Sequence, residues 1–306
     1  MKSIMKKKAL ICMALMLCMV AQEAMALRIR IKVPSGSSGD ENGVVNWIIF
    51  AVVAVIILVG AYYYLGEFKT TLRLVFGGMR VDSKTTLSKD QQRKILLSAP
   101  YSVQSKLLMN SVKTGMQKEE RYFTLSKEWD IWNHETATRV LNEQKVAGVN
   151  RYFEHIAEAF KLKEQQAVQQ YLDNTFVLKE DAQACGKQIE YAFKEVGNLV
   201  KLGIIRDDAD FVRIGAAAWD ASRLVYLARL CFESKYISEE EMWQFVDAAD
   251  EMAHKSITSW EDYGKSYLIG CVLWGGGRLQ VKMQSREIKK LTDNPKSLWN
   301  SIPFAK

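Results

Sequence analysis

One stretch of the sequence, GAAAWDASRLVYLARL at residues 215–230, constrains the fold more than any other. Its spacing predicts a helix, and on a helical wheel alanines, aliphatic side chains and aromatic rings cover nearly every side. A helix that is apolar nearly all round is normally packed on all sides. We therefore expect residues 215–230 to form the central helix of their domain, with the alanine face allowing other helices to approach closely.

The rest of the chain from about Leu87 onward shows apolar residues recurring at spacings of three and four, which indicates helices. Ser88, Ser238 and Ser259 each precede an acidic or amide residue at the offset of a helix start. Longer helices are expected over 150–172, 178–201 and 209–232. The predicted fold class is all-α: a linker at 67–86, a multi-helix globular domain at 87–290 and a C-terminal tail at 291–306.

The first 43 residues are typical of a secretory signal followed by a short spacer. Lysines precede a 13-residue apolar run, and small residues stand at Ala24 and Ala26. This three-part pattern predicts a signal peptide at residues 1–26, with an uncleaved anchor as the alternative. Residues 27–43 are rich in Gly, Ser and charges, which predicts a flexible spacer outside the cytoplasm.

Residues 44–66, VVNWIIFAVVAVIILVGAYYYLG, contain no charged side chain. A helix of 23 apolar residues is long enough to cross the hydrocarbon core of a bilayer, and aromatic residues stand near both ends. Whether the signal is cleaved or stays as a second span, residues 67–306 end in the cytoplasm. If the first run never enters the translocon, they lie outside. We expect a single-pass protein of the cytoplasmic membrane with its helical domain in the cytoplasm.

Charge and cysteine content narrow the function classes. The chain carries a formal net charge of +7 from 42 basic and 35 acidic residues, without a block of one sign in the body. A nucleic-acid-binding protein normally concentrates its basic residues on one face, so we expect no nucleic-acid partner. Two of the five cysteines lie in the first apolar run. The other three, Cys185, Cys231 and Cys271, are too far apart for a disulfide framework or a metal knuckle.

The sequence contains none of the common catalytic motifs. The chain has no phosphate-binding loop, no dinucleotide-binding glycine pattern, no H-E-x-x-H and no G-x-S-x-G. The three histidines are far apart, and Cys185 is either a structural or a reactive thiol. The sequence therefore predicts no catalytic residue, no metal site and no cofactor, and it leaves open whether the protein is an enzyme.

A cluster of aromatic and charged residues remains as the candidate site. Its members, which fall in two predicted helices, are Trp219, Asp220, Arg223, Tyr226, Trp260 and Tyr263. Asp220 and Arg223 are three residues apart in an apolar helix, so each needs a polar partner if it is buried. They can form a structural network, paired with each other or with neighbouring helices. Alternatively, Arg223 holds an anion in a pocket and Asp220 accepts a proton or orients Arg223.

Five segments of the domain together resemble the bacterial domain-of-unknown-function family 1266. They are LLMNSVKTG (107–115), LSKEWDI (125–131), AAWDASRLVYLARL (217–230), YISEEEMWQFVDAA (236–249) and SWEDYGKSYLIG (259–270). The resemblance extends from about Leu87 to Arg286. It implies a helical domain without implying a reaction. Family members usually place Arg after the last glycine, where this chain has Cys271, so one family charge is missing here.

The predicted function is a membrane-anchored module that binds a protein partner or scaffolds an assembly. Catalytic motifs are absent from the sequence, and Trp and Tyr, which serve both cores and interfaces, are numerous. The alternative is an enzyme or small-ligand-binding domain with its site around Asp220, Arg223, Trp260 and Tyr263. A concave pocket lined by these side chains favours the alternative, and a fully paired network favours scaffolding.

Overall fold

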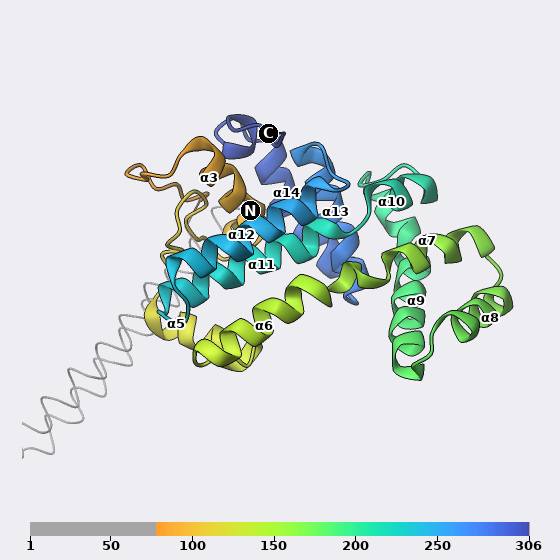
Figure 1. Ribbon diagram of the computed structural model, residues 1–306. Helices are drawn as coiled ribbons and strands as arrows, with labels where there is room; N and C mark the ends of the chain where they lie inside the picture. The colour runs from red at the N-terminus through yellow and green to blue at the C-terminus, as the bar shows by residue number, and fades with distance from the viewer. Residues whose placement is uncertain (1–77, 306) are drawn as a thin grey trace, which may run out of the picture. The chain divides into compact units, whose positions relative to one another are not determined.

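The computed structural model describes residues 78–305, which belong to one compact unit of the chain, Leu65–Lys306. In this range the protein is all-α, as predicted, and its β pairing is limited to an isolated bridge between Arg80 and Leu108 (Figure 1). No helix in this range is long and apolar enough to cross a bilayer. The predicted signal peptide, spacer and transmembrane helix lie outside the described residues.

The described part consists of α-helices joined by short 3-10 turns and one π turn. In chain order they are α3 (Lys89–Ile95), η1 (Leu96–Ser98), α4 (Ala99–Gln104), α5 (Lys118–Phe123), η2 (Thr124–Glu128), α6 (His134–Val146), η3 (Val149–Tyr152), α7 (Phe153–Leu162), α8 (Gln165–Thr175), α9 (Lys179–Lys201), α10 (Asp208–Ile214), α11 (Ala217–Glu233), α12 (Glu239–His254), α13 (Trp260–Leu273), α14 (Arg278–Asp293) and η4 (Leu298–Asn300).

Helix α11 is the centre of the domain, as its composition predicts. Of its 17 residues, 14 are buried. It packs against α12, α13, α6 and α4, and also against the turns η1 and η3. Figure 1 shows α11 and α12 side by side, while α7, α8 and α9 form a lobe at one end of the domain. Side chains on α11 therefore meet partners from most parts of the described chain.

Three of the predicted helix starts are confirmed. The Ser238 hydroxyl accepts the Glu241 N–H, and the Glu241 carboxylate accepts the Ser238 N–H, which completes a capping box. This backbone hydrogen bond is the largest of the effects that lower the pKa of Glu241 to about 2. Ser88 makes the same arrangement with Gln91, and Ser259 accepts the N–H of Asp262. Each start depends on contacts within four residues.

Two of the predicted helices are wrong because the structure divides each of them into shorter helices. The expected helix over 150–172 is divided into η3, α7 and α8, with Lys163 at φ 62 between the last two. The expected helix over 209–232 is divided at Gly215, where φ is 71, into α10 and α11. A positive φ ends the helical hydrogen-bond ladder and turns the chain. The third expected helix, 178–201, is confirmed as α9.

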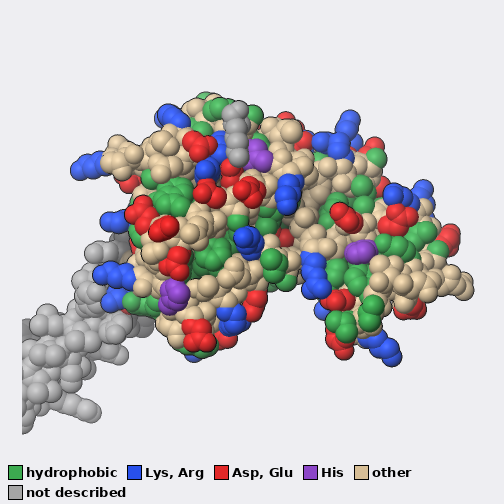
Figure 2. All heavy atoms as spheres, in the orientation of Figure 1, with side chains coloured by type: hydrophobic (Ala, Val, Ile, Leu, Met, Phe, Trp, Pro, Cys, Tyr) green, Lys and Arg blue, Asp and Glu red, His purple; other side chains and the backbone are tan. Residues whose placement is uncertain are grey.

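Residues expected to be linker or tail also pack on the helical domain. The Asp82 N–H donates to the Asn110 side chain, which ties the start of the described chain to the loop before α5. Near the other end, Trp299, Ile302 and Phe304 are buried in the core. On the surface shown in Figure 2, lysines and arginines are interspersed with aspartates and glutamates.

Candidate functional site

Asp220 bonds to a neighbouring helix, which is one of the two structural alternatives, and not to Arg223. Its side chain is 2% exposed, and its two oxygens accept the backbone N–H groups of Val149 (3.0 Å) and Asn150 (2.7 Å) at the start of η3. Burial raises the pKa of the Asp220 carboxyl above its ordinary value, whereas these N–H donors and the charge of Arg223 oppose that rise. Asp220 thus satisfies two otherwise unpaired backbone donors from across the domain.

Gly148 allows this contact because it has no side chain. A Cβ at this position would lie 2.3 Å from both Cγ and Oδ2 of Asp220, which is far inside van der Waals contact. Gly148 is therefore required by close approach rather than by an unusual backbone angle. A cleft of about 480 Å³ reaches Asp220 and is lined in part by Lys145, Arg151 and Lys255. Both carboxylate oxygens are nevertheless engaged by η3.

Arg223 lies among three indole rings. Its guanidinium carbon is 4.7 Å from the ring centroid of Trp129, 5.7 Å from that of Trp219 and 6.0 Å from that of Trp274. These distances are within the range of cation–π attraction. Trp219 is buried, Arg223 and Trp129 are partly buried, and Trp274 is 54% exposed. We call these four residues the tryptophan–arginine cluster.

Three tyrosines extend the cluster into the core. The ring of Tyr101 stacks on Tyr226 at 4.7 Å and meets the edge of Tyr267 at 6.1 Å. Tyr267 in turn lies 4.9 Å from Trp219. Burial raises the pKa of all three tyrosines, that of Tyr101 to about 12. Their phenols are neutral near pH 7, and a phenol hydroxyl can both donate and accept a hydrogen bond.

Several buried donors in this region have no acceptor among the described residues. They include Nε of Arg223, Nε1 of Trp219 and the hydroxyl of Tyr267. An unsatisfied buried donor costs on the order of 1–3 kcal/mol. The arginine and indole N–H groups can only donate, so no rearrangement among themselves satisfies them. The buried N–H groups of Arg223 and Trp219 therefore lack an acceptor among the described residues.

Arg229, on the same helix, differs from Arg223 because both of its terminal nitrogens have acceptors, although its Nε has none among the described residues. Arg229, which is 0% exposed, donates to the hydroxyls of Ser98 and Ser102 and to two loop carbonyls. Burial lowers the pKa of Arg229 to about 10. Within residues 78–305, the guanidinium of Arg223 makes no ion pair and no hydrogen bond. In the sequence, both residues are arginines on one apolar helix. Only the fold shows that their hydrogen-bond partners differ.

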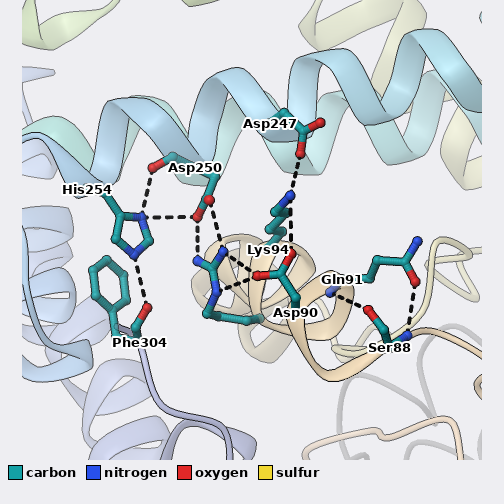
Figure 3. A network of polar contacts seen from close by, with 9 residues as sticks. Ser88, Asp90, Gln91, Lys94, Asp247, Asp250, His254 and Phe304 are labelled. Atoms are coloured by element: carbon teal, nitrogen blue, oxygen red, sulfur yellow. Dashed lines mark hydrogen bonds and ion pairs between the residues drawn. The ribbon is translucent and has the colours of Figure 1, made fainter. Parts of the chain in front are cut away.

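A second polar network includes Asp250, His254 and Phe304, which are labelled in Figure 3. Arg93 of α3 donates to both carboxylate oxygens of Asp250 of α12. The ring of His254 hydrogen-bonds the Asp250 backbone carbonyl through Nδ1 and the Phe304 carbonyl through Nε2. Both ring nitrogens are therefore engaged. The network ties α3, α12 and the end of the chain together.

Trp260 and Tyr263 belong to another aromatic group, beside the end of the chain. Trp260 stacks on Trp299 at 4.8 Å, and its indole N–H donates to the Ile302 carbonyl. The Tyr263 hydroxyl donates to the Leu97 carbonyl at 2.8 Å. The structure thus brings Trp219 and Arg223 together and joins Tyr226 to Trp219 through Tyr101. It directs Asp220 to η3, whereas Trp260 and Tyr263 pack against the C-terminal segment.

The site residues predicted from the sequence did not include Tyr101, Trp129, Tyr267 or Trp274. Trp129 follows η2, and Trp274 is the C-cap residue of α13. Neither is near Arg223 in sequence. Nothing in the sequence, apart from the presence of Trp129 in one family-like segment, pointed to their contact with Arg223.

The remaining candidates are buried thiols, as nucleophiles, and groups of His, Cys, Asp and Glu side chains, as metal ligands; among residues 78–305, neither provides a site outside the tryptophan–arginine cluster. Cys185, Cys231 and Cys271 are free and buried, and burial raises the pKa of the first to about 11 and of the others to about 12. They are therefore protonated and weakly nucleophilic near neutral pH. In the part of the chain that the structure describes, no group of three or more His, Cys, Asp or Glu side chains could hold a metal ion.

Comparison with known proteins gives one family. Residues 124–304 match the family model described as Protein of unknown function (DUF1266). The matched range includes all four residues of the tryptophan–arginine cluster and extends to the buried C-terminal segment. No curated protein and no solved structure shows a significant match to the chain.

Proposed function

The chain belongs to the DUF1266 family of proteins of unknown function, and from that premise we propose that its helical domain is a protein-interaction module. The proposed recognition surface is the tryptophan–arginine cluster. One observation carries the proposal: a partly buried guanidinium lies among three tryptophans, one of them 54% exposed, without an acceptor in the described residues. Trp and Arg are the residue types most enriched at the energetic centres of protein interfaces.

The position of the cluster supports this function. Trp219 and Arg223 stand on the buried central helix, whereas Trp129 and Trp274 come from the ends of other elements. A rigid helix holds the arginine in place, so little side-chain freedom remains to be lost on binding. An exposed Trp274 can then bury its ring against a partner, which is the usual behaviour of an interface anchor.

Arg223→Met tests whether the cluster serves binding or stability. We expect the melting temperature to fall by no more than about 4 °C, because the lost cation–π contacts contribute roughly 1 kcal/mol and methionine still covers the indole rings. Collapse of the melting temperature in this variant would instead assign Arg223 a structural role.

The same variant is then combined with photo-crosslinking in cells of the native host. A photoreactive amino acid at position 274 of the full chain is expected to form a covalent protein adduct that disappears in the Arg223→Met background. The matched control carries the same group at Val177, which is 98% exposed and lies between α8 and α9. Equal adducts at both positions, or adducts that survive Arg223→Met, contradict the proposed surface.

The enzyme or small-ligand alternative rests on a different feature. The cleft of about 480 Å³ beside Asp220 has the size of a small-molecule site. Its lining includes Asp220 but none of Arg223, Trp260 and Tyr263, so the four residues first grouped together do not line one cavity there. The protein-interaction proposal therefore has the stronger support.

We also propose that residues 44–66 anchor the protein in the inner membrane with the helical domain in the cytoplasm. The uncharged 23-residue run supports the anchor, and three free buried thiols suit a reducing compartment. A reporter fused after Lys306 that is active only in the cytoplasm is expected to be active. Activity of a reporter that works only outside the cytoplasm would reverse the orientation.

A further inference from the structure

We infer that the tryptophan–arginine cluster binds a single carboxylate, presented by the partner protein as a chain end or an acidic side chain. The inference rests on the proposed function and names the chemistry of its site. Three features of the described residues carry it: the unpaired donors, the single positive charge and the aromatic walls.

The unpaired donors require an acceptor. Nε of Arg223, Nε1 of Trp219 and the Tyr267 hydroxyl are all buried without a partner in residues 78–305. Trp219 lies against both other residues, 5.7 Å from Arg223 and 4.9 Å from Tyr267 by ring centroid. The N–H groups of Arg223 and Trp219 can only donate, whereas the Tyr267 hydroxyl can also accept. An anion or water satisfies donor-only groups, and a guanidinium favours the anion.

The nearby carboxylates of the chain itself do not fill this role. Both oxygens of Asp220 accept backbone N–H groups of η3. Glu128 is exposed and is near enough to raise the pKa values of Tyr101 and Tyr226, yet within the described residues it forms no ion pair with Arg223. Arg223 therefore remains available to a carboxylate from another molecule.

Charge and shape favour a carboxylate over a phosphate. Arg223 is the cation held against the three indole rings. The next arginine on the helix, Arg229, is wholly buried, and its terminal nitrogens already have acceptors. One guanidinium balances one carboxylate and matches its planar fork. A phosphate dianion would leave a charge uncompensated beside apolar rings. The same rings would pack against an apolar stem next to the carboxylate.

The test follows the indole N–H resonances of the full chain in detergent micelles, labelled with ¹⁵N-tryptophan. N-acetylleucine is the probe because it carries one carboxylate on an apolar stem. We expect it to shift the Trp219 indole resonance, assigned with Trp219→Phe, in a saturable manner. N-acetylleucinamide, which lacks the carboxylate, is expected to leave that resonance unchanged.

Variants and competing probes complete the design. Arg223→Met is expected to weaken N-acetylleucine binding at least about tenfold, as for loss of a charged hydrogen-bonding partner. Arg139→Met, which removes the same charge from a side chain 49% exposed on α6, is expected to leave it unchanged. Arg223→Met is expected to retain the apolar packing. Its melting temperature then shows whether the binding comparison is made on a folded protein.

Four results would overturn the inference. A shift of equal strength with N-acetylleucinamide removes the need for an anion, and one with inorganic phosphate removes the preference for a carboxylate. Equal affinity for acetate shows that a free small carboxylate is the ligand instead of a chain-borne one. If the carboxylate effect is absent while the cross-link at position 274 persists, this inference fails and the proposed function stands. Absence of the cross-link with a retained carboxylate effect contradicts the proposed function instead.

Discussion

Replacing Gly270 with alanine is expected to destabilise the helical domain by about 3 kcal/mol, the upper end of the usual cost of overpacking a core. Gly270 is in α13 where this helix meets α11, and a Cβ there would lie 2.1 Å from Cβ of Trp219. The Ala216 carbonyl oxygen, 3.3 Å from the same point, limits movement in another direction. The two helices must therefore separate. Separation also disturbs the ring contacts of Trp219 with Tyr267 and Trp274.

Thermal and denaturant unfolding measure this effect, with Gly197→Ala as the matched control. Gly197 is exposed inside α9, and a Cβ there meets nothing within 4 Å. The control is expected to stabilise the protein by about 0.5–1 kcal/mol, because alanine has the higher helix propensity. For a domain of this size, the Gly270 variant should melt about 6–12 °C below the wild type. Equal melting of the two variants would mean that α11 and α13 are not in close contact.

Replacing Asp220 with alanine is expected to cost about 3 kcal/mol, the second large effect. The variant removes the acceptor of two N–H groups, on Val149 and Asn150, in a place that is only 2% exposed. Each unsatisfied donor costs on the order of 1–3 kcal/mol. Relief from burying the carboxylate, whose pKa is raised by desolvation, offsets a part of this cost. We therefore expect the start of η3 to unfold locally before the rest of the domain.

Asp207→Ala is the control for Asp220→Ala, because Asp207 also caps a helix start with its carboxylate. It accepts the N–H of Asp210 at 2.8 Å in α10, but it is exposed, so water can replace it. Its loss is expected to cost only about 1 kcal/mol. Hydrogen exchange at the amides of Val149 and Asn150 should rise in Asp220→Ala and stay unchanged in Asp207→Ala. Equal stability of the two variants would refute the capping role of Asp220.

The helix starts could be predicted because they depend on neighbours in the sequence. At Ser238, the hydroxyl and the Glu241 carboxylate reach backbone groups three residues away, and this geometry is the same in any fold. The breaks were harder to predict. Lys163 adopts φ 62 although it is not a glycine, and no local residue pattern requires that conformation. Gly215 offered a signal, yet the apolar spacing on both sides of it suggested one continuous helix.

The candidate site could be predicted in its central residues and not in its partners. Spacing along α11 places Asp220 and Arg223 within reach of each other, and the sequence therefore suggested a pair. In the fold, Asp220 is bound by backbone groups 70 and 71 residues earlier in the chain. Trp260 and Tyr263 were grouped with them because they are aromatic and follow a similar helical spacing, yet they pack against Trp299 and Phe304.

By itself, the sequence determined the all-α class, the main helix starts and the burial of α11, because these follow from hydrogen bonds within one turn and from the periodicity of apolar residues. Only the tertiary structure decided that Asp220 caps η3 and that Arg223 lies among Trp129, Trp219 and Trp274. The reason is physical. A buried polar side chain takes the partner that packing brings to it, and that partner comes from distant parts of the chain.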